Sequence, residues 1–253
     1  MNVARPPVPT VRVRKFYYDP DLLSGPTLPR DEIHVWHQDL SGGGPAMDTF
    51  ARLLSADEIQ RASRFRFAND RNEYVVARGA LRVLLGSYRN VPPQDLRFAY
   101  SEYGRPYLIG DSPPQALEFN VSHSGGIALL AFAQERKIGI DVEKVRRNFA
   151  TGEIAERFFS RAERAALREL PQEQRHEAFF RCWTRKEAFI KALGEGLSHP
   201  LDQFDVSLAP GAPAAILSTR PDAREATRWM LWNIEAPVDY AAALAAESNC
   251  KPV

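Results

Sequence analysis

The chain has 253 residues, of which 44% are hydrophobic, and its formal net charge is +1 at pH 7. A chain of this length and composition can bury the core of one large domain or of two smaller ones. A net charge this close to zero creates no global field that would recruit nucleic acid or an anionic membrane. Two cysteines without metal-binding spacing and the lack of any long apolar run favour a cytosolic protein without a membrane span.

Residues 1–30 form the first distinct stretch of the chain. They are rich in proline and contain scattered basic residues, without the apolar segment that would follow in a signal peptide. We therefore interpret residues 1–30 as an extended N-terminal flank.

The remaining sequence contains a faint internal duplication at an offset of 105 residues. Residues 33–38 match residues 138–143, and both are typical of short strands with apolar side chains on alternate positions. Ser55 and Glu58 match Ser160 and Glu163, and each pair predicts a capping box at a helix start. Two long helical segments match as well. These matches predict an α+β fold.

The predicted fold is a pseudodimer of two similar αβ subdomains, at residues 31–137 and 138–253. In each subdomain a small antiparallel sheet packs on one long helix, because either element must bury its apolar face against the other. The second subdomain carries the candidate metal-binding acids.

The long helix of the second half contains a candidate site. It is rich in good helix formers and ends at Gly194, a residue suited to a left-handed cap. Glu187 and Lys191 lie one turn apart on the same stripe, with Lys186 beside them. An isolated pair of this kind is more often a solvated surface pair, so its function depends on the rest of the chain.

Two further acids precede this helix, in the predicted strand at residues 138–143. Asp141 and Glu143 face the same side of the strand, because side chains alternate. With Glu187 they would form an all-oxygen set that suits Mg²⁺, although ordinary charges on an exposed edge strand are the alternative. The matching positions of the first half carry no acid: they are Trp36, Gln38 and Arg82. The acids therefore indicate one site per chain.

A third group of candidates could bind phosphate. The stretch Phe-Asn-Val-Ser-His-Ser-Gly-Gly at residues 119–126 combines hydroxyls, an imidazole and a glycine turn with exposed N–H groups. Ser122 and His123 are its candidate ligands, and a purely structural turn is the alternative. Three arginines are further candidates: Arg61, Arg64 and Arg105. Guanidinium groups suit phosphate well, but solvated arginines are the commoner outcome.

Five stretches together resemble, in order and spacing, the motifs of the 4'-phosphopantetheinyl transferases, in the larger pseudodimeric Sfp-type branch. They are Tyr-Gly-Arg-Pro at 103–106, Phe-Asn-Val-Ser-His-Ser-Gly at 119–125, Ile-Gly-Ile-Asp-Val-Glu at 138–143, Phe-Phe-Ser at 158–160, and Trp-Thr-Arg-Lys-Glu-Ala-Phe-Ile-Lys-Ala-Leu-Gly-Glu-Gly-Leu at 183–197. The resemblance covers residues 31–207.

The resemblance implies a reaction: phosphopantetheine moves from coenzyme A to a serine of an apo acyl or peptidyl carrier protein, releasing 3',5'-ADP. It also implies roles for the residues. Asp141, Glu143 and Glu187 would hold Mg²⁺, and either Glu187 or a metal-bound water would take the serine proton. Lys191 would steady the departing phosphate, and Lys186 matches a phosphate ligand. Ser122 and His123 would contact the ribose 3'-phosphate, with Arg61, Arg64 and Arg105 as further phosphate partners.

Two functions of other classes remain as alternatives. One is a binding module that keeps a coenzyme A pocket without turnover, against which the intact acids and Lys191 argue. The other is a Mg²⁺-dependent pyrophosphatase or phosphodiesterase, which would share the acids but need no surface for a carrier. For the transferase, a monomer with its site between the two halves is expected.

Overall fold

The structure, a computed structural model, describes residues 8–18, 25–41, 45–110, 116–147 and 149–248. The first half contains β2 (Glu32–Asp39), α1 (Pro45–Leu53), α2 (Ala56–Ser63), α3 (Ala68–Arg89), β3 (Phe98–Tyr100), β4 (Pro106–Leu108), β5 (Leu117–Ser124) and β6 (Ile127–Gln134). The second contains β7 (Ile138–Lys144), α4 (Thr151–Phe158), α5 (Arg161–Glu169), α6 (Gln172–Leu193), β8 (Phe204–Val206), β9 (Ile216–Thr219), β10 (Trp229–Asn233) and β11 (Tyr240–Glu247). The same order of elements in both halves confirms the predicted fold class.

The sheets repeat this correspondence. The first sheet contains the antiparallel strands β2, β6 and β5 in that order, and the second contains β7, β11 and β10. Each half also has a small antiparallel pair beside its long helix, β3 with β4 and β8 with β9. In the part of the chain that the structure describes, no helix is long and apolar enough to cross a membrane.

The N-terminal flank contributes an additional strand. Residues Thr10–Lys15 form β1, which pairs in parallel with β2 at the edge of the first sheet. The first sheet is therefore mixed, whereas only antiparallel pairing was expected. The rest of the flank before residue 25 is described only at residues 8–9 and 16–18.

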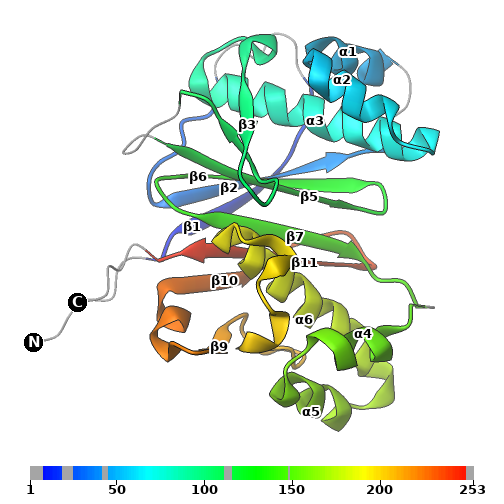
Figure 1. Cartoon of the computed structure of the whole chain (residues 1–253), viewed down its shortest axis with the longest axis vertical. Helices are drawn as coiled ribbons and strands as arrows, with labels where there is room; N and C mark the ends of the chain where they lie inside the picture. The colour runs from blue at the N-terminus through cyan, green and yellow to red at the C-terminus, as the bar shows by residue number, and fades with distance from the viewer. Residues whose placement is uncertain (1–7, 19–24, 42–44, 111–115, 148, 249–253) are drawn as a thin grey trace, which may run out of the picture.

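The two halves stack as four layers, with α3 above the first sheet and α6 below the second (Figure 1). One apolar cluster lies between α3 and the first sheet, and another between α6 and the second sheet. A third cluster joins the two sheets face to face and includes Val35 and Leu129 from the first and Ile140 and Leu244 from the second. The inner faces of both sheets are therefore buried by each other.

The predicted helix boundaries are present. Glu58 accepts a hydrogen bond from the Ser55 N–H at 2.9 Å, and Glu163 accepts one from the Ser160 N–H at 2.9 Å, which closes both capping boxes. Helix α6 ends at Gly194, whose φ of 81° lies in the left-handed region and whose N–H bonds the Ile190 carbonyl.

Strands β5 and β7 lie side by side where the two sheets meet (Figure 1). Among the described residues no main-chain pairing joins these strands, which belong to separate sheets. Side chains on alternate residues of β5 instead accept hydrogen bonds from N–H groups of β7. The pairs are Asn120 with Ile140, Ser122 with Val142 and Ser124 with Lys144, at 2.9, 3.3 and 3.2 Å. Polar side chains thus satisfy the free edge of β7.

A polar network fastens β1 and β2 to α3. The Tyr88 hydroxyl accepts from the Trp36 indole at 2.9 Å and lies 2.7 Å from Nδ1 of buried His34. Nε2 of His34 lies 3.1 Å from Glu32, which also accepts from Arg12 of β1 at 2.6 Å. This arrangement assigns the Nε2–H tautomer, in which Nδ1 accepts a hydrogen bond from the Tyr88 hydroxyl. Burial lowers the pKa of His34, which is consistent with a neutral ring.

We expect Tyr88→Phe to lower the free energy of unfolding by about 1–3 kcal/mol, because it leaves polar groups of Trp36 and His34 without their shared partner. Tyr107→Phe, at a half-exposed tyrosine of β4, is the matched control and should change stability little. Urea unfolding of both variants measures the difference. Equal stability of the two variants would show that this network does not stabilise the packing of β1 and β2 on α3.

Candidate active site

The candidate acids lie where α6 packs closely on β7. Gly139, Asp141 and Glu143 occupy alternate positions of β7, and Gly139 faces the α6 backbone. A Cβ at Gly139 would lie only 2.2 Å from the carbonyl oxygen of Ala188. The missing side chain therefore allows α6 to approach, which brings Glu187 to the side of β7 that carries the acids.

Asp141 is the centre of the site. Its carboxylate is almost fully buried, and Oδ1 accepts from the Lys191 ammonium at 2.6 Å and from the Ser122 hydroxyl at 2.8 Å. Its other oxygen, Oδ2, is buried and has no hydrogen-bond partner among the described residues. A buried carboxylate oxygen without a partner is costly unless a cation or another donor meets it.

Glu143 and Glu187 share the electrostatic environment of Asp141. Burial raises the pKa of Glu143, and the negative charge of Asp141 raises it further, although the Ser124 hydroxyl donates to its Oε2 at 2.8 Å. Burial raises the pKa of Glu187 to about 7, with added repulsion from Asp141 and Glu143. Lys191 opposes both shifts. The protein has therefore gathered three acids whose repulsion a bound cation would relieve.

The residues fit a divalent cation, although the described side chains include no ready cluster of three acid, histidine or cysteine ligands. The fit rests on the free Oδ2 of Asp141 and on two further carboxylates at close electrostatic range. Carboxylate oxygens with water are the donors that Mg²⁺ prefers, and one or two carboxylates suffice when a substrate phosphate supplies the rest.

The raised pKa of Glu187 predicts that the metal-free protein loses folding stability as pH rises. The folded state keeps the Glu187 proton up to about pH 7, whereas the unfolded chain releases it near 4.5, so this stabilisation is lost as pH rises between those values. We expect Glu187→Gln to gain stability relative to the wild-type protein from about pH 5 to about pH 8. Thermal unfolding with a chelator present measures it, and Glu177→Gln, an exposed acid of α6, is the control. A constant difference between wild type and Glu187→Gln would contradict the prediction.

Lys186, predicted as a phosphate ligand, has protein partners in the structure. Its side chain is completely buried, its ammonium donates to the Leu201 and Phe204 carbonyls at 2.6 and 2.7 Å, and it pairs with Glu163 at 2.8 Å. With three protein partners and no exposure, this ammonium anchors α6 to its own half. The motif placed Lys186 next to Glu187 in sequence, but adjacent helix residues point in different directions.

Ser122, also predicted as a phosphate ligand, forms three hydrogen bonds within the protein. The hydroxyl donates to Asp141 and accepts from the Val142 N–H at 3.3 Å and from Lys191 at 3.0 Å. A serine hydroxyl has one proton and two lone pairs, so these three bonds use its full capacity. In this structure the Ser122 hydroxyl therefore binds the acid and the lysine, and its phosphate contact stays a prediction.

Arg105 is likewise engaged. Its guanidinium donates to the carbonyls of Lys191 and Ala192 at the end of α6, at 3.1 and 3.4 Å, and to Glu118 at 2.8 Å. A cation at a helix C-terminus is stabilised by the helix dipole. Arg105 thus fixes the end of α6 next to Lys191, and its phosphate contact stays a prediction.

The other predicted phosphate ligands are accessible. His123 is exposed on the first half, although neighbouring atoms remove part of the water around its ring and so lower its pKa, with a smaller effect of Lys191. Arg61 and Arg64 line a pocket of about 510 Å³ together with Tyr100. The Arg61 guanidinium lies over the ring of Tyr74, 5.7 Å from its centre. The roles of these three residues stay predictions.

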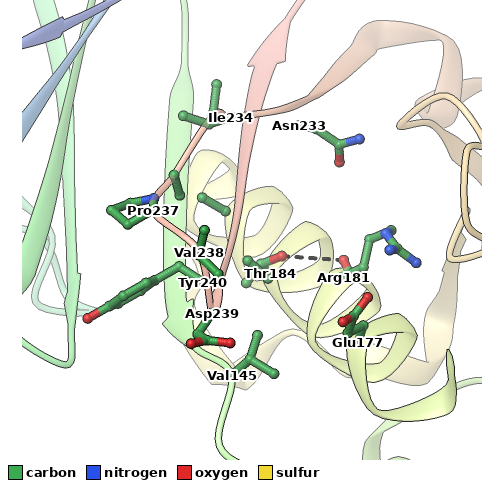
Figure 2. A pocket seen from close by; sticks show the side chains of 13 residues that line it. Val145, Glu177, Arg181, Thr184, Asn233, Ile234, Pro237, Val238, Asp239 and Tyr240 are labelled. Carbon is green, nitrogen blue, oxygen red and sulfur yellow. Dashed lines mark hydrogen bonds between the residues drawn. The ribbon is translucent and has the colours of Figure 1, made fainter. Parts of the chain in front are cut away.

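A second pocket, of about 430 Å³, lies beside residues 177–184 of α6. Figure 2 shows its lining, which includes Glu177, Arg181 and Thr184 of α6 and Pro237 and Val238 in the segment between β10 and β11. None of the predicted site residues lines this pocket. The candidate site is therefore the seam where β5, β7 and α6 meet, not this pocket.

Comparisons with known proteins agree with the fold and the motifs. Residues 137–245 match the 4'-phosphopantetheinyl transferase superfamily, and residues 44–135 match the N-terminal part of 4'-phosphopantetheinyl transferases. The 4'-phosphopantetheinyl transferase HetI of Nostoc sp. is 40% identical over 195 residues, or 77% of this chain and 81% of that protein. The 4'-phosphopantetheinyl transferase Sfp of Bacillus subtilis is 35% identical, over 64% of this chain and 69% of its own.

A human relative and a solved structure extend the comparison. The human L-aminoadipate-semialdehyde dehydrogenase-phosphopantetheinyl transferase is 33% identical over 63% of this chain and 54% of its own. The solved Chronobacterium ammoniagenes ACPS-CoA complex matches 44% of this chain and 95% of its own at 20% identity and a TM-score of 0.34. The chain belongs to the 4'-phosphopantetheinyl transferase superfamily. Its activity is that of the family, transfer of phosphopantetheine from coenzyme A to a carrier protein.

Proposed function

We propose that the chain performs this transfer as a Mg²⁺-dependent monomer in the cytosol, with one active site at the seam between its halves. The acceptor is a serine of an apo acyl or peptidyl carrier protein, and the second product is 3',5'-ADP. The observation that carries the proposal is Asp141, whose Oδ1 is held by Lys191 and Ser122 while its buried Oδ2 lacks a partner.

Asp141, Glu143 and Glu187 are the residues that would hold Mg²⁺ in this proposal. When bound, the ion neutralises charge on the pyrophosphate of coenzyme A and stabilises the charge that develops during transfer. Helix α6 and strand β7 carry the three carboxylates, and their mutual repulsion supports the same assignment.

The reaction forms a bond between the serine oxygen and the phosphorus that carries pantetheine, and breaks the bond from that phosphorus to the oxygen of 3',5'-ADP. Glu187 would take the serine proton at a carboxylate oxygen, acting as the general base of the transfer. Lys191 would stabilise the phosphate of the departing 3',5'-ADP, because its ammonium already lies in the site, 2.6 Å from Asp141.

The ribose 3'-phosphate would lie on the first half of the molecule. His123 projects from β5 on the side away from Ser122 and Ser124, because side chains alternate along the strand. Arg61 and Arg64 supply exposed guanidinium groups on the same half, and their forked donors suit a phosphate. Binding across the seam would explain why the site draws residues from both halves.

A single assay tests the proposal. The purified chain is incubated with coenzyme A, Mg²⁺ and an apo carrier, and intact carrier mass is measured with and without a chelator. We expect one phosphopantetheine on the carrier serine, only when Mg²⁺ is present, and none on a carrier whose serine is replaced by alanine. Consumption of coenzyme A without a carrier would identify a hydrolase, and binding of coenzyme A without any product would identify a binding module.

A further inference from the structure

The hydrogen bonds between β5 and β7 have two functions at once. The Ser122 and Ser124 hydroxyls accept from the main-chain N–H groups of Val142 and Lys144, at 3.3 and 3.2 Å, and so join the two halves of the molecule. Both serines are buried, at 7% and 8% exposure. These two N–H groups would otherwise lie unpaired at the edge of β7.

The same hydroxyls hold the acids of the site. Ser122 donates its proton to Oδ1 of Asp141 and Ser124 donates its proton to Oε2 of Glu143, both at 2.8 Å. A hydroxyl can accept a hydrogen bond from the backbone and donate one to a carboxylate at the same time, whereas the methyl group of alanine can do neither. Asp141 and Glu143 are therefore each oriented by a serine of the first half.

We propose that Ser122 and Ser124 are positioning residues that hold Asp141 and Glu143 in the orientation needed to bind a divalent cation. The inference rests on the proposed function, because it assigns these serines to the metal site described there. It couples the junction of the two halves to the affinity of that site. Both serines act on the cation through a carboxylate.

Ser122 has an additional effect through Lys191. The Lys191 ammonium lies 3.0 Å from the Ser122 hydroxyl and 2.6 Å from Asp141. The hydroxyl therefore contacts both the ammonium and the carboxylate. Ser122 and Lys191 both donate to Oδ1 of Asp141, and Oδ2 of this carboxylate has no donor among the described residues. Without the hydroxyl, Lys191 can approach both carboxylate oxygens and compete with the divalent cation.

The test measures cation binding directly, with Mn²⁺ as a spectroscopic substitute for Mg²⁺. Binding of Mn²⁺ to the full chain, in the presence of coenzyme A, is followed by electron paramagnetic resonance. We expect Ser122→Ala and Ser124→Ala each to weaken Mn²⁺ affinity by about 10- to 100-fold, the usual effect of losing a partner of a metal ligand. Ser122→Thr keeps the hydroxyl and should restore most of the affinity.

Asn120→Ala is the matched control. Asn120 accepts from the Ile140 N–H at 2.9 Å in the same junction, but no hydrogen bond joins it to an acid among the described residues. We expect it to lower the free energy of unfolding as much as the serine variants while leaving Mn²⁺ affinity of the folded protein unchanged.

Three outcomes would overturn the inference: serine variants that bind Mn²⁺ as tightly as the wild-type protein, a threonine variant no better than alanine, or equal loss of affinity in Asn120→Ala. A wild-type chain that binds no Mn²⁺, or transfers without any divalent cation, would instead contradict the proposed metal site itself. Thermal unfolding of every variant identifies one that does not fold, and the remaining variants still decide between the outcomes.

Discussion

Asp141→Asn is expected to lower phosphopantetheine transfer on the order of 1,000-fold, because electrostatic stabilisation of the transition state depends on a negative group at this position. The amide keeps the size of the carboxylate and its Oδ1 can still accept from Lys191 and Ser122, so the fold should remain intact. Loss of one of three repelling charges should also lower the pKa of Glu187 from its value of about 7. Carrier labelling and NMR titration of Glu187 measure the two effects.

Asp239→Asn is the control for this prediction. Asp239 is an exposed acid just before β11 with a φ of 68°, a conformation that asparagine also adopts readily. We expect it to leave transfer and stability close to those of the wild-type protein. A near-normal rate for Asp141→Asn at saturating Mg²⁺ would exclude Asp141 from the metal site.

Gly139→Ala is expected to impair stability and activity together. The new Cβ would lie 2.2 Å from the Ala188 carbonyl oxygen and 2.4 Å from the Ala192 nitrogen, both in the α6 backbone, so the helix must move away from β7. Overpacking of this kind costs about 1–3 kcal/mol of unfolding free energy. The shift also moves Lys191 away from Asp141, so transfer should fall more than the loss of folded protein explains.

Gly152→Ala is the control that separates the clash with α6 from the general effect of replacing a glycine by alanine. Gly152 lies in α4, and a Cβ there would meet no atom within 4 Å. Alanine is the better helix former by about 1 kcal/mol in a helix interior, so this variant should be as stable as the wild-type protein or slightly more stable. Denaturant unfolding and the carrier assay are run on both variants. Gly139→Ala matching Gly152→Ala in both measurements would contradict the close packing of α6 on β7.

Much of the fold was predictable because its signals are local. The capping boxes at Ser55 and Ser160, the end of α6 at Gly194 and the alternating strands depend on residues a few positions apart. The duplication was visible because each half repeats the same order of elements. Strand β1 was missed, since its pairing with β2 depends on contacts between distant segments.

For three predicted phosphate ligands the structure shows protein partners that the motifs did not reveal. The sequence placed Lys186, Ser122 and Arg105 among the phosphate ligands because they belong to motifs that contain such ligands. In the structure Lys186 is buried against Glu163, and the other two hold Asp141 and the end of α6. The alternation of polar residues at positions 120, 122 and 124 was the available signal, but it did not reveal which strand they face.

The sequence by itself determined the family, the two αβ halves and the restriction of the acids to the second half, because motif order and local periodicity are properties of the chain alone. Only the tertiary structure decided which polar groups are already used by the protein. Hydrogen-bonding capacity and burial depend on neighbours brought together across the β5–β7 junction and under α6. Those neighbours assign Ser122 to Asp141, leave Oδ2 of that carboxylate without a partner and raise the pKa of Glu187 to about 7.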